Sequence, residues 1–268
     1  MANGWIQAEK VSLAYATGQV LHDVSFAVAA GESFGIIGPN GSGKSSLLKL
    51  ISGVLKPTAG ELRLEGRPAH LHPRRSLARW MAVLQQDALP PLDFTVREVI
   101  EMGRFPFQNW LGDERNGDAR QLIDTIVDRL QLQELQHRSV SQLSGGERQR
   151  VALGKVMAQQ PRLLLLDEPT TYLDIGYQVQ MMEWIRRWQQ EEELTVVAVL
   201  HDLNLAAQYC GRLLLVQAGR VVSIGQPEEV IRPELLERVY GTQPIVLPHP
   251  ATGVPQVLLH GGGAEHEA

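Results

Sequence analysis

The stretch Phe34-Gly-Ile-Ile-Gly-Pro-Asn-Gly-Ser-Gly-Lys-Ser45 decides the fold of this chain. Its first four residues form a compact apolar run, which is typical of a strand buried on both faces. A glycine-rich loop follows at once, and Leu47, Leu48 and Ile51 then predict a helix that ends at Gly53. From Gly38 onward the residues match the pattern G-x-x-x-x-G-K-[ST], in the strand–loop–helix context that confirms a phosphate-binding loop.

Each residue type in this loop has a chemical reason. Its glycines let the backbone fold tightly and turn N–H groups inward as a nest for phosphate oxygens. The helix that follows points its positive end at the same anion. Lys44 supplies an ammonium for the β and γ phosphates, and Ser45 offers a hydroxyl to magnesium. An ordinary glycine turn is the alternative, but it does not require so many matching positions. The candidate nucleotide-binding residues are Gly38, Pro39, Asn40, Gly41, Ser42, Gly43, Lys44, Ser45 and Ser46.

A second apolar run, Leu163 to Leu166, ends in two adjacent carboxylates, Asp167 and Glu168. Ligands bind at the carboxyl ends of strands in open α/β sheets, so both side chains are expected beside the phosphate loop. Asp167 is the candidate magnesium ligand, and Glu168 is the candidate acceptor of a proton from the attacking water. The alternative is a surface pair that caps the next helix.

Short strands alternate with helices along much of the chain, which predicts an α/β fold with a largely parallel sheet. Shorter alternating strands near the N-terminus predict an added antiparallel layer. Residues 87–157 are mostly helical in pattern and are expected to form an insertion. The further predicted strands are 6–13, 24–28, 62–64, 194–200, and a hairpin of 213–216 with 221–224.

Composition limits the class of function. The chain has 268 residues and a formal net charge of −5, so it lacks the overall basic charge that favours nucleic acid. Cys210 is the only cysteine, which excludes an internal disulfide and suggests a reducing compartment. No apolar stretch approaches the roughly twenty residues of a membrane span, and the N-terminus does not have the pattern of a secretory signal. Work at a membrane would therefore require a partner.

The stretch Leu143-Ser-Gly-Gly-Glu147 is a second candidate anion site. Ser144 and Glu147 have the spacing of a capping box, so plain helix capping is one explanation. It does not explain the glycine pair, because glycine costs roughly 1 kcal/mol within a helix. Glycines at an exposed helix start would let a phosphate approach the backbone closely.

Taken in order, the phosphate loop, Leu-Ser-Gly-Gly-Glu and Leu-Asp-Glu-Pro resemble the nucleotide-binding subunit of an ABC transporter, over about residues 5–240. The resemblance implies a P-loop NTPase (RecA-like) core with an N-terminal antiparallel β layer and an inserted α-helical subdomain. Residues 1–240 would form one ATPase domain, with a catalytic core of about 1–86 and 158–240 and a helical subdomain of about 87–157. Residues 241–268 would be a short C-terminal extension with a flexible tail.

The same resemblance assigns roles to residues outside the two loops. Tyr15 matches the aromatic residue that stacks on adenine, although a strand residue facing the core is the alternative. Gln86 matches the glutamine that senses the γ-phosphate and magnesium, and Gln85 is a rival for this role. His201, at the end of a buried strand, matches the histidine that touches the γ-phosphate. Asp174 matches the aspartate that acts across the dimer.

In this family two subunits pack head to tail, and each ATP lies between one phosphate loop and the other subunit's Ser-Gly-Gly helix. A monomer is then expected to be nearly inactive, and ATP and Mg²⁺ are the implied cofactors. The implied catalytic residues are Glu168, His201 and Gln86. The implied metal ligands are Ser45, Gln86 and Asp167. The implied contacts from the second subunit are Ser144, Gly145, Gly146, Glu147 and Asp174.

Three stretches resemble the ATPases of importers for iron–siderophore complexes, haem or vitamin B12: 102–107, 167–175 and 249–253. The expected partners are a second copy of the chain, two permease subunits and an extracytoplasmic substrate-binding protein, with no nucleic acid. Permease docking is expected near Gln86 to Trp110, where Phe94, Phe105 and Phe107 also cluster, although some of these aromatics would pack the insertion instead. The expected location is peripheral, on the cytoplasmic face of the membrane.

Two other classes of ATPase remain alternatives. A soluble ABC ATPase that acts on a macromolecular partner is the first, but the chain lacks the long coiled insertion or second ATPase unit that is usual for DNA or ribosome work. An ATP-sensing module without hydrolysis is the second, and the presence of Glu168 argues against it. His249, His260 and His266 have no metal-site spacing and are interpreted as surface residues.

Overall fold

The structure is a computed structural model that describes residues 5–86, 89–90, 93–108 and 119–259. A six-stranded sheet runs through its centre, in the order β10-β9-β3-β8-β7-β6. Neighbouring strands from β9 to β6 are parallel, and β10 is antiparallel to β9. The strand bounds are β3 Ser33–Ile37, β6 Met81–Leu84, β7 Leu163–Asp167, β8 Thr195–Val199, β9 Arg212–Gln217 and β10 Arg220–Gly225.

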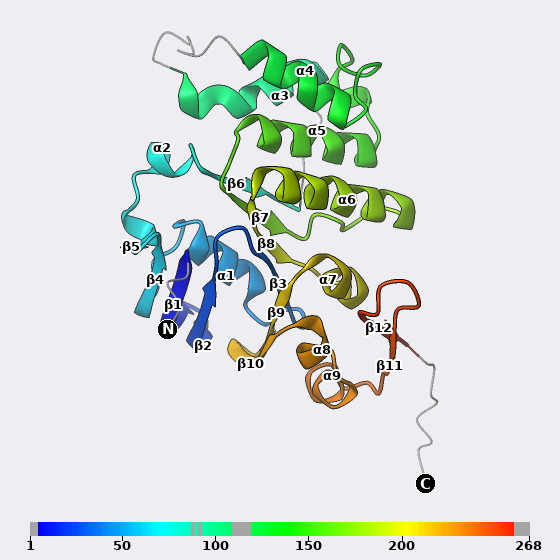
Figure 1. Cartoon of the computed structure of the whole chain (residues 1–268). Coiled ribbons are helices and arrows are strands. Elements are labelled where there is room, and N and C mark those ends of the chain that lie inside the picture. The colour runs from blue at the N-terminus through cyan, green and yellow to red at the C-terminus, as the bar shows by residue number, and fades with distance from the viewer. Residues whose placement is uncertain (1–4, 87–88, 91–92, 109–118, 260–268) are drawn as a thin grey trace.

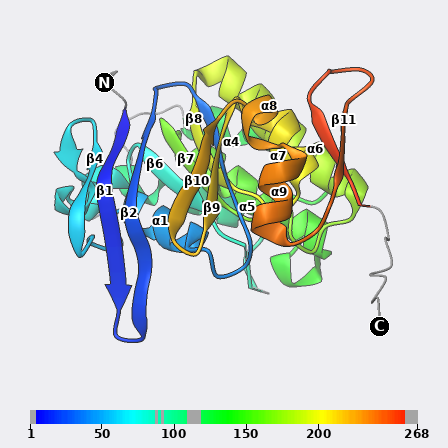
Figure 2. The same ribbon diagram turned by 90° about the horizontal axis from the view of Figure 1, so that it is seen from below.

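A separate antiparallel sheet, in the order β2-β1-β4-β5, lies to one side of the central sheet (Figure 2). Its strands are β1 Ile6–Tyr15, β2 Gly18–Val28, β4 Ala59–Leu64 and β5 Arg67–Pro68. Between the two sheets lies α1 Lys44–Ile51 (Figure 1). The predicted antiparallel N-terminal layer and parallel core are therefore both present.

The central sheet separates two hydrophobic cores, because successive side chains of a strand point to opposite faces. In β7, Leu163 and Leu165 pack with α1 and the antiparallel sheet. Leu164 and Leu166 pack with helices on the other face. All four leucines are buried. This two-sided burial is the reason that β7 is a continuous apolar run in the sequence.

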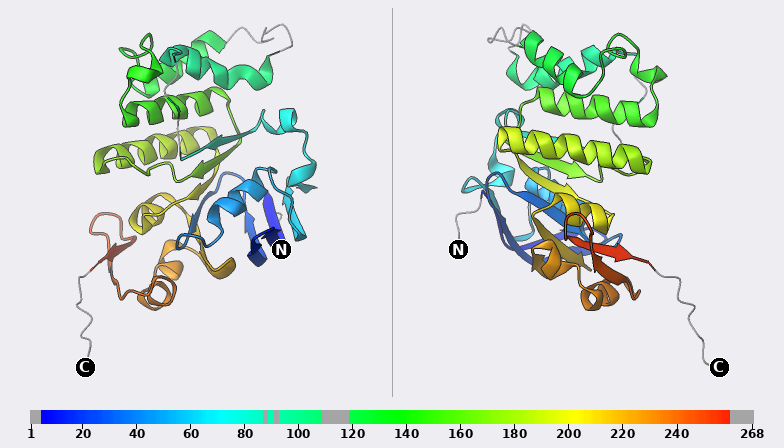
Figure 3. Two further views of the ribbon diagram at one scale, coloured as in Figure 1. Left: turned by 180° about the vertical axis from the view of Figure 1, so that it is seen from behind. Right: turned by 45° about the vertical axis from the view of Figure 1, so that its right-hand side comes forward.

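Helices stack in layers on the second face (Figures 1 and 3). Nearest the sheet are α6 Ile175–Glu192 and α7 Leu203–Tyr209, and beyond them lie α5 Gly145–Ala158 and then α3 Val96–Glu101 and α4 Ala119–Arg129. The shorter helices are η1 Ala69–Leu71, α2 Arg74–Leu77, η2 Met102–Phe107, η3 Val140–Gln142, α8 Pro227–Val230 and α9 Pro233–Tyr240.

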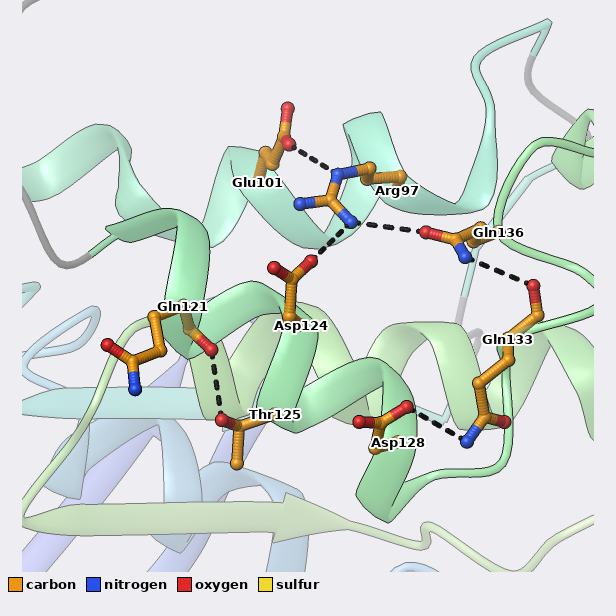
Figure 4. Close-up of polar contacts among 8 residues, drawn as sticks. All are labelled: Arg97, Glu101, Gln121, Asp124, Thr125, Asp128, Gln133 and Gln136. Carbon is orange, nitrogen blue, oxygen red and sulfur yellow. Dashed lines mark hydrogen bonds and ion pairs between the residues drawn. The ribbon is translucent and has the colours of Figure 1, made fainter.

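Arg97 joins the two outermost helices (Figure 4). From α3, its guanidinium donates to Asp124 Oδ1 of α4 at 2.7 Å, to Gln136 Oε1 at 3.1 Å and to Glu101 Oε1 at 3.2 Å. The hydrogen bond to Asp124 is the main reason that the pKa of Arg97 lies above its ordinary value. Because these groups are partly exposed, the network orients α3 and α4 more than it stabilises the fold.

The C-terminal segment forms structure that the sequence did not predict. β11 Ile245–Pro248 and β12 Pro255–Leu258 pair as an antiparallel hairpin, and β12 packs against α7. Figure 3 shows this red hairpin at the opposite end of the molecule from the green helices α3 and α4. The sequence had suggested only a proline- and glycine-rich extension here. The tail expected to fray, 261–268, lies outside the described residues.

Candidate active site

The loop between β3 and α1 has a backbone that glycine makes possible at two positions. Gly38 has φ +150°, and a Cβ there would lie 2.0 Å from the Val216 carbonyl oxygen of β9. Gly43 has φ +100°, and a Cβ there would lie 2.6 Å from Leu21 Cδ2. Both positions combine a left-handed backbone with close packing, so the loop is held in one shape against the core.

Lys44 occupies the centre of this loop. Its side chain is only 5% exposed, and Nζ donates to the carbonyl oxygens of Gly38 and Pro39, both at 2.9 Å. Burial lowers the pKa of the ammonium, while the nearby carboxylates of Glu168 and Asp167 act in the opposite direction. From this position a rotation of the flexible lysine stem would bring the amine to an incoming phosphate without its leaving the site.

Three further residues of the expected nucleotide site lie around the loop. The Ser42 hydroxyl is buried and has no hydrogen-bond partner among the described residues. The Tyr15 hydroxyl lies 3.3 Å from Ser46 Oγ, at the start of α1. Tyr15 is 40% exposed at the end of β1, so its ring does not face the core. That exposure leaves the ring available for stacking.

Asp167 ends β7 and meets the start of α1. Ser45 Oγ donates to Asp167 Oδ1 at 3.3 Å. Burial raises the pKa of the Asp167 carboxyl, and the hydrogen bond from Ser45 opposes that rise. A carboxylate and a hydroxyl at this separation are hard oxygen donors of the kind that Mg²⁺ prefers. No cluster of three or more His, Cys, Asp or Glu suited to a metal occurs among the described residues. Ser45 and Asp167 supply two oxygen ligands, and a cation here would take the others from Gln86, water or phosphate.

Glu168 and His201 meet at the ends of two neighbouring strands. Asp167 pairs with Val199 in the parallel β7–β8 ladder, so the residues beyond each strand emerge side by side. His201 Nε2 lies 2.5 Å from Glu168 Oε1. The backbone N–H of Glu168 donates to the Val199 carbonyl at 3.1 Å, which fixes the glutamate's position. This pair combines a carboxylate and an imidazole, the two groups most often used to move protons in enzymes.

The two candidate glutamines follow β6 at the same edge of the sheet. Leu84 pairs with Leu166 in the β6–β7 ladder, so the chain after β6 runs close to the end of β7. Gln85 is exposed, whereas Gln86 is half-buried. Gln86 also lines a cavity of about 440 Å³ together with Gly145 at the start of α5 and residues 171–173 after β7. This position, at the junction of the sheet and the helical layers, favours Gln86 over Gln85.

The predicted capping box is present at the start of α5. Ser144 Oγ accepts from the backbone N–H of Glu147 at 3.3 Å, and Glu147 Oε2 accepts from the backbone N–H of Ser144 at 2.8 Å. The latter bond is the main cause of the lowered pKa of Glu147. A Cβ added to Gly146 would touch the Tyr177 ring at 3.2 Å, but one added to Gly145 would meet nothing within 4 Å. The capping box is therefore present, but no contact among the described residues requires glycine at position 145.

The sites at 38–46 and 144–147 are not joined to each other. No hydrogen bond links them in the part of the chain that the structure describes. Asp174 has a local role, because its Oδ1 accepts from the backbone N–H of Tyr177 at 2.9 Å and caps α6. The ends of the parallel strands thus bring together the phosphate loop, Asp167, Glu168 and His201. Gln86 follows the neighbouring strand β6 and shares its cavity with Gly145, while Ser144, Glu147 and Asp174 make the local capping contacts described above.

The expected docking surface is partly exposed. Phe94 and Phe105 are exposed, Phe107 is half-buried beneath Arg104 at 4.2 Å, and Trp110 lies outside the described residues. No helix in the described part of the chain is long and apolar enough to cross a bilayer.

Two residues near the site were missed by the sequence analysis. Tyr240, the last residue of α9, is half-buried near the phosphate loop. Burial raises its pKa to about 12, and a hydrogen bond with the Gly38 backbone acts in the opposite direction. Asn204, in the first turn of α7, hydrogen-bonds Val257 of the C-terminal hairpin. Neither contact has a local sequence signal, because both join residues far apart in the chain.

The chain is similar to known proteins. The family model for ABC transporters matches residues 21–171. The chain is 35% identical over 263 residues to the ferric enterobactin transport ATP-binding protein FepC of Escherichia coli (strain K12), covering 98% of this chain and 97% of FepC. It is 39% identical over 238 residues to the petrobactin import ATP-binding protein FpuC of Bacillus anthracis, covering 89% and 87% of the two chains.

Two solved structures share the fold. One is CbiO1 of Clostridium perfringens, part of the ABC transporter complex CbiONQ, with a TM-score of 0.77 at 26% identity; the match covers 88% of this chain and 93% of CbiO1. The other is a dimeric ATP-binding cassette in a post-hydrolysis state bound to ADP and Pi, with a TM-score of 0.72 at 27% identity. That match covers 82% of this chain and 98% of the cassette.

Proposed function

This chain belongs to the ABC transporter family of ATP-binding proteins, and from that premise we propose that it energises the import of iron–siderophore complexes. As a member of the family it binds ATP and is an ATPase coupled to transport. The cargo is proposed from the relatives FepC and FpuC, whose names specify ferric enterobactin and petrobactin.

The loop residues hold the triphosphate in this proposal. Backbone N–H groups of 38–46 and the start of α1 would bind its oxygens, and the Lys44 ammonium would leave the Gly38 and Pro39 carbonyls for the β and γ phosphates. Tyr15 would stack on adenine. Ser45, Asp167 and Gln86 would hold Mg²⁺, which when bound neutralises charge on the phosphates.

Glu168 and His201 carry the chemistry of hydrolysis. The Glu168 carboxylate accepts a proton from water as the water oxygen bonds to the γ-phosphorus, and the bond from that phosphorus to the β–γ bridging oxygen breaks. His201, beside Glu168, contacts the γ-phosphate and helps to orient the water. The single observation that carries this proposal is the 2.5 Å contact between Glu168 Oε1 and His201 Nε2 next to the Lys44 loop.

A Glu168→Gln variant tests the proposal. We expect it to bind ATP within about threefold of the wild-type affinity, because the amide preserves the size of the side chain. Loss of the proton acceptor should lower kcat at least about a hundredfold. Glu234→Gln, an exposed position on α9, is the matched control and should keep wild-type turnover. Turnover of Glu168→Gln within tenfold of the wild type would remove Glu168 from this role.

We further propose that the working unit is a head-to-tail dimer. The open space at Gly145 supports this, because a phosphate held by a second copy could approach the start of α5. A related cassette is dimeric in its post-hydrolysis state. Ser144, Gly145, Gly146, Glu147 and Asp174 would then contact ATP across the interface.

The membrane partners are proposed to be two permease subunits that dock near Gln86 to Trp110, with an extracytoplasmic substrate-binding protein completing the system. Exposed Phe94 and Phe105 support this docking surface. The chain would then lie on the cytoplasmic face of the membrane. Purification of tagged protein from its native membranes tests this, since a permease should copurify; recovery of soluble partners alone would contradict transport.

We also propose the domain division that the sequence suggested. The catalytic core would span about 1–86 and 158–240, and the helical subdomain about 87–157. The Arg97 network that joins α3 to α4 supports treating these helices as one unit.

A further inference from the structure

The Asn204 amide binds the C-terminal hairpin as a neighbouring strand would. Val257 N–H donates to Asn204 Oδ1 at 2.6 Å, and Asn204 Nδ2 donates to the Val257 carbonyl at 3.2 Å. Val257 lies opposite Val246 in the hairpin, and both of its backbone groups bond to Asn204. A side-chain amide that pairs with both groups of one residue reproduces the pattern of a β ladder and fixes distance and direction together.

Asn204 lies three residues from His201, at the start of a short helix. Asp202 caps α7, and its Oδ1 accepts from the backbone N–H groups of Asn204 at 2.7 Å and Leu205 at 3.0 Å. His201 is the residue just before this cap. The hairpin is therefore connected to His201 in three steps. Hydrogen bonds join Val257 to Asn204 and Asn204 to Asp202, and a peptide bond joins Asp202 to His201.

The position of α7 depends on such contacts. A helix of seven residues is too short to be stable alone, so tertiary contacts set where it lies. At its far end, the Tyr209 hydroxyl donates to Glu183 Oε1 of α6 at 3.0 Å. In the first turn of α7, next to His201, Asn204 supplies a polar tie to the hairpin. The hairpin in turn rests on the main core through Val246, Val254 and Val257.

We propose that the C-terminal hairpin positions His201 for ATP hydrolysis, with Asn204 as the positioning residue. The inference rests on the proposed roles of Glu168 and His201. Release of the hairpin would let the first turn of α7 move, and His201 would move with it. Catalytic geometry is sensitive to such shifts, because a displacement of about 1 Å can cost roughly a hundredfold in rate.

The test compares Asn204→Ala with Gln208→Ala in the full-length chain. Gln208 lies one turn further along α7 and also carries an amide, so it is the matched control. We expect Asn204→Ala to lower kcat about five- to tenfold while the KM for ATP and the stoichiometry of ATP binding stay within twofold of wild type. Gln208→Ala should leave all three unchanged.

A His201→Ala background separates positioning from a general loss of structure. If Asn204 acts through His201, Asn204→Ala should lower kcat no further in that background. Val257→Pro provides a second route, because it removes the hairpin's donor and leaves α7 intact; proline is tolerated on an edge strand. It should reproduce the Asn204→Ala defect.

Wild-type kcat in Asn204→Ala and Val257→Pro would overturn the inference. The inference would also be overturned if Asn204→Ala lowered kcat by the same factor in the His201→Ala background. It would be overturned as well if the fall in kcat matched a fall in the amount of protein able to bind ATP. Failure of the proposed function would look different: Glu168→Gln and His201→Ala themselves would then keep wild-type turnover.

Discussion

At the scale of single residues, Asp167 and Glu168 are adjacent in sequence but serve different neighbours. Asp167 accepts from Ser45, whereas Glu168 contacts His201. The backbone of Glu168 has φ +53°, a left-handed conformation that costs a non-glycine residue about 1 kcal/mol or more. Such strain persists where surrounding contacts fix it, as the bond from the Glu168 N–H to Val199 does here.

Asp167→Asn should stabilise the folded chain at neutral pH. Burial raises the pKa of Asp167, so the folded state holds its proton more tightly than the unfolded state. The protonated Asp167 therefore contributes to the free energy of unfolding. This contribution is fully present below the unfolded pKa, near 3.9, and is lost as the pH rises through the raised pKa of the folded state. The asparagine variant avoids the loss and should melt about 1–3 °C higher at pH 7.5.

Melting curves at several pH values measure this effect. The difference in Tm between Asp167→Asn and wild type should shrink as pH falls toward 4. Asp128→Asn, on the exposed face of α4, is the control and should show no such trend. An Asp167→Asn variant that melts at or below the wild-type temperature at pH 7.5 would contradict the argument.

At the scale of elements, the parallel strands could be predicted because burial on both faces makes them continuous apolar runs, as in Leu163 to Leu166. The glycine-rich loop could be predicted because its chemistry is local. Strand order could not, and the contact of His201 with Glu168 depends on β7 and β8 being neighbours. The C-terminal hairpin was hidden because Pro248 and Pro255 flank its turn and resemble a loop in sequence.

The close packing of η2 against α5 requires glycine at position 103, and no sequence pattern indicated this requirement. A Cβ at this position in η2 would lie 2.1 Å from the Lys155 carbonyl oxygen of α5. Gly103→Ala must therefore push η2 away from α5, and overpacking of this kind costs about 1–3 kcal/mol. Urea denaturation should show a free energy of unfolding lower by that amount.

Gly145→Ala is the matched control for this prediction. Its added methyl group meets nothing within 4 Å, so the free energy of unfolding should not fall. Equal stability of the Gly103→Ala variant and wild type would show that η2 and α5 can separate without cost. The exposed Phe105 on η2 would then be carried by a movable segment.

At the scale of the whole molecule, the two proposed anion sites, the phosphate loop and the start of α5, have different surroundings. The phosphate loop follows β3, and the proposed catalytic residues Gln86, Glu168 and His201 follow β6, β7 and β8 of the same sheet. The start of α5 has open space and no hydrogen bond to that loop in the described structure. In our proposal each chain carries two different halves of an ATP site, and a two-fold dimer would complete both sites at once.

Mixing two inactive variants tests this arrangement. Lys44→Ala should lose ATP binding at its own loop, because a buried, charge-assisted contact to phosphate is removed. Gly145→Asp should fold, since the position is open and a carboxylate suits the first turn of a helix, but it should repel the phosphate of a second subunit. Each variant alone should have almost no ATPase activity.

In a mixed dimer, one site receives both defects and the other receives none. Random exchange in an equal mixture makes half of the dimers mixed, so about a quarter of wild-type activity should return if the two sites act independently. Sites built within one chain would give no recovery, because every chain carries a defect. Recovery clearly above a quarter would also be informative, since it would mean that one intact site drives hydrolysis faster when its neighbour cannot turn over.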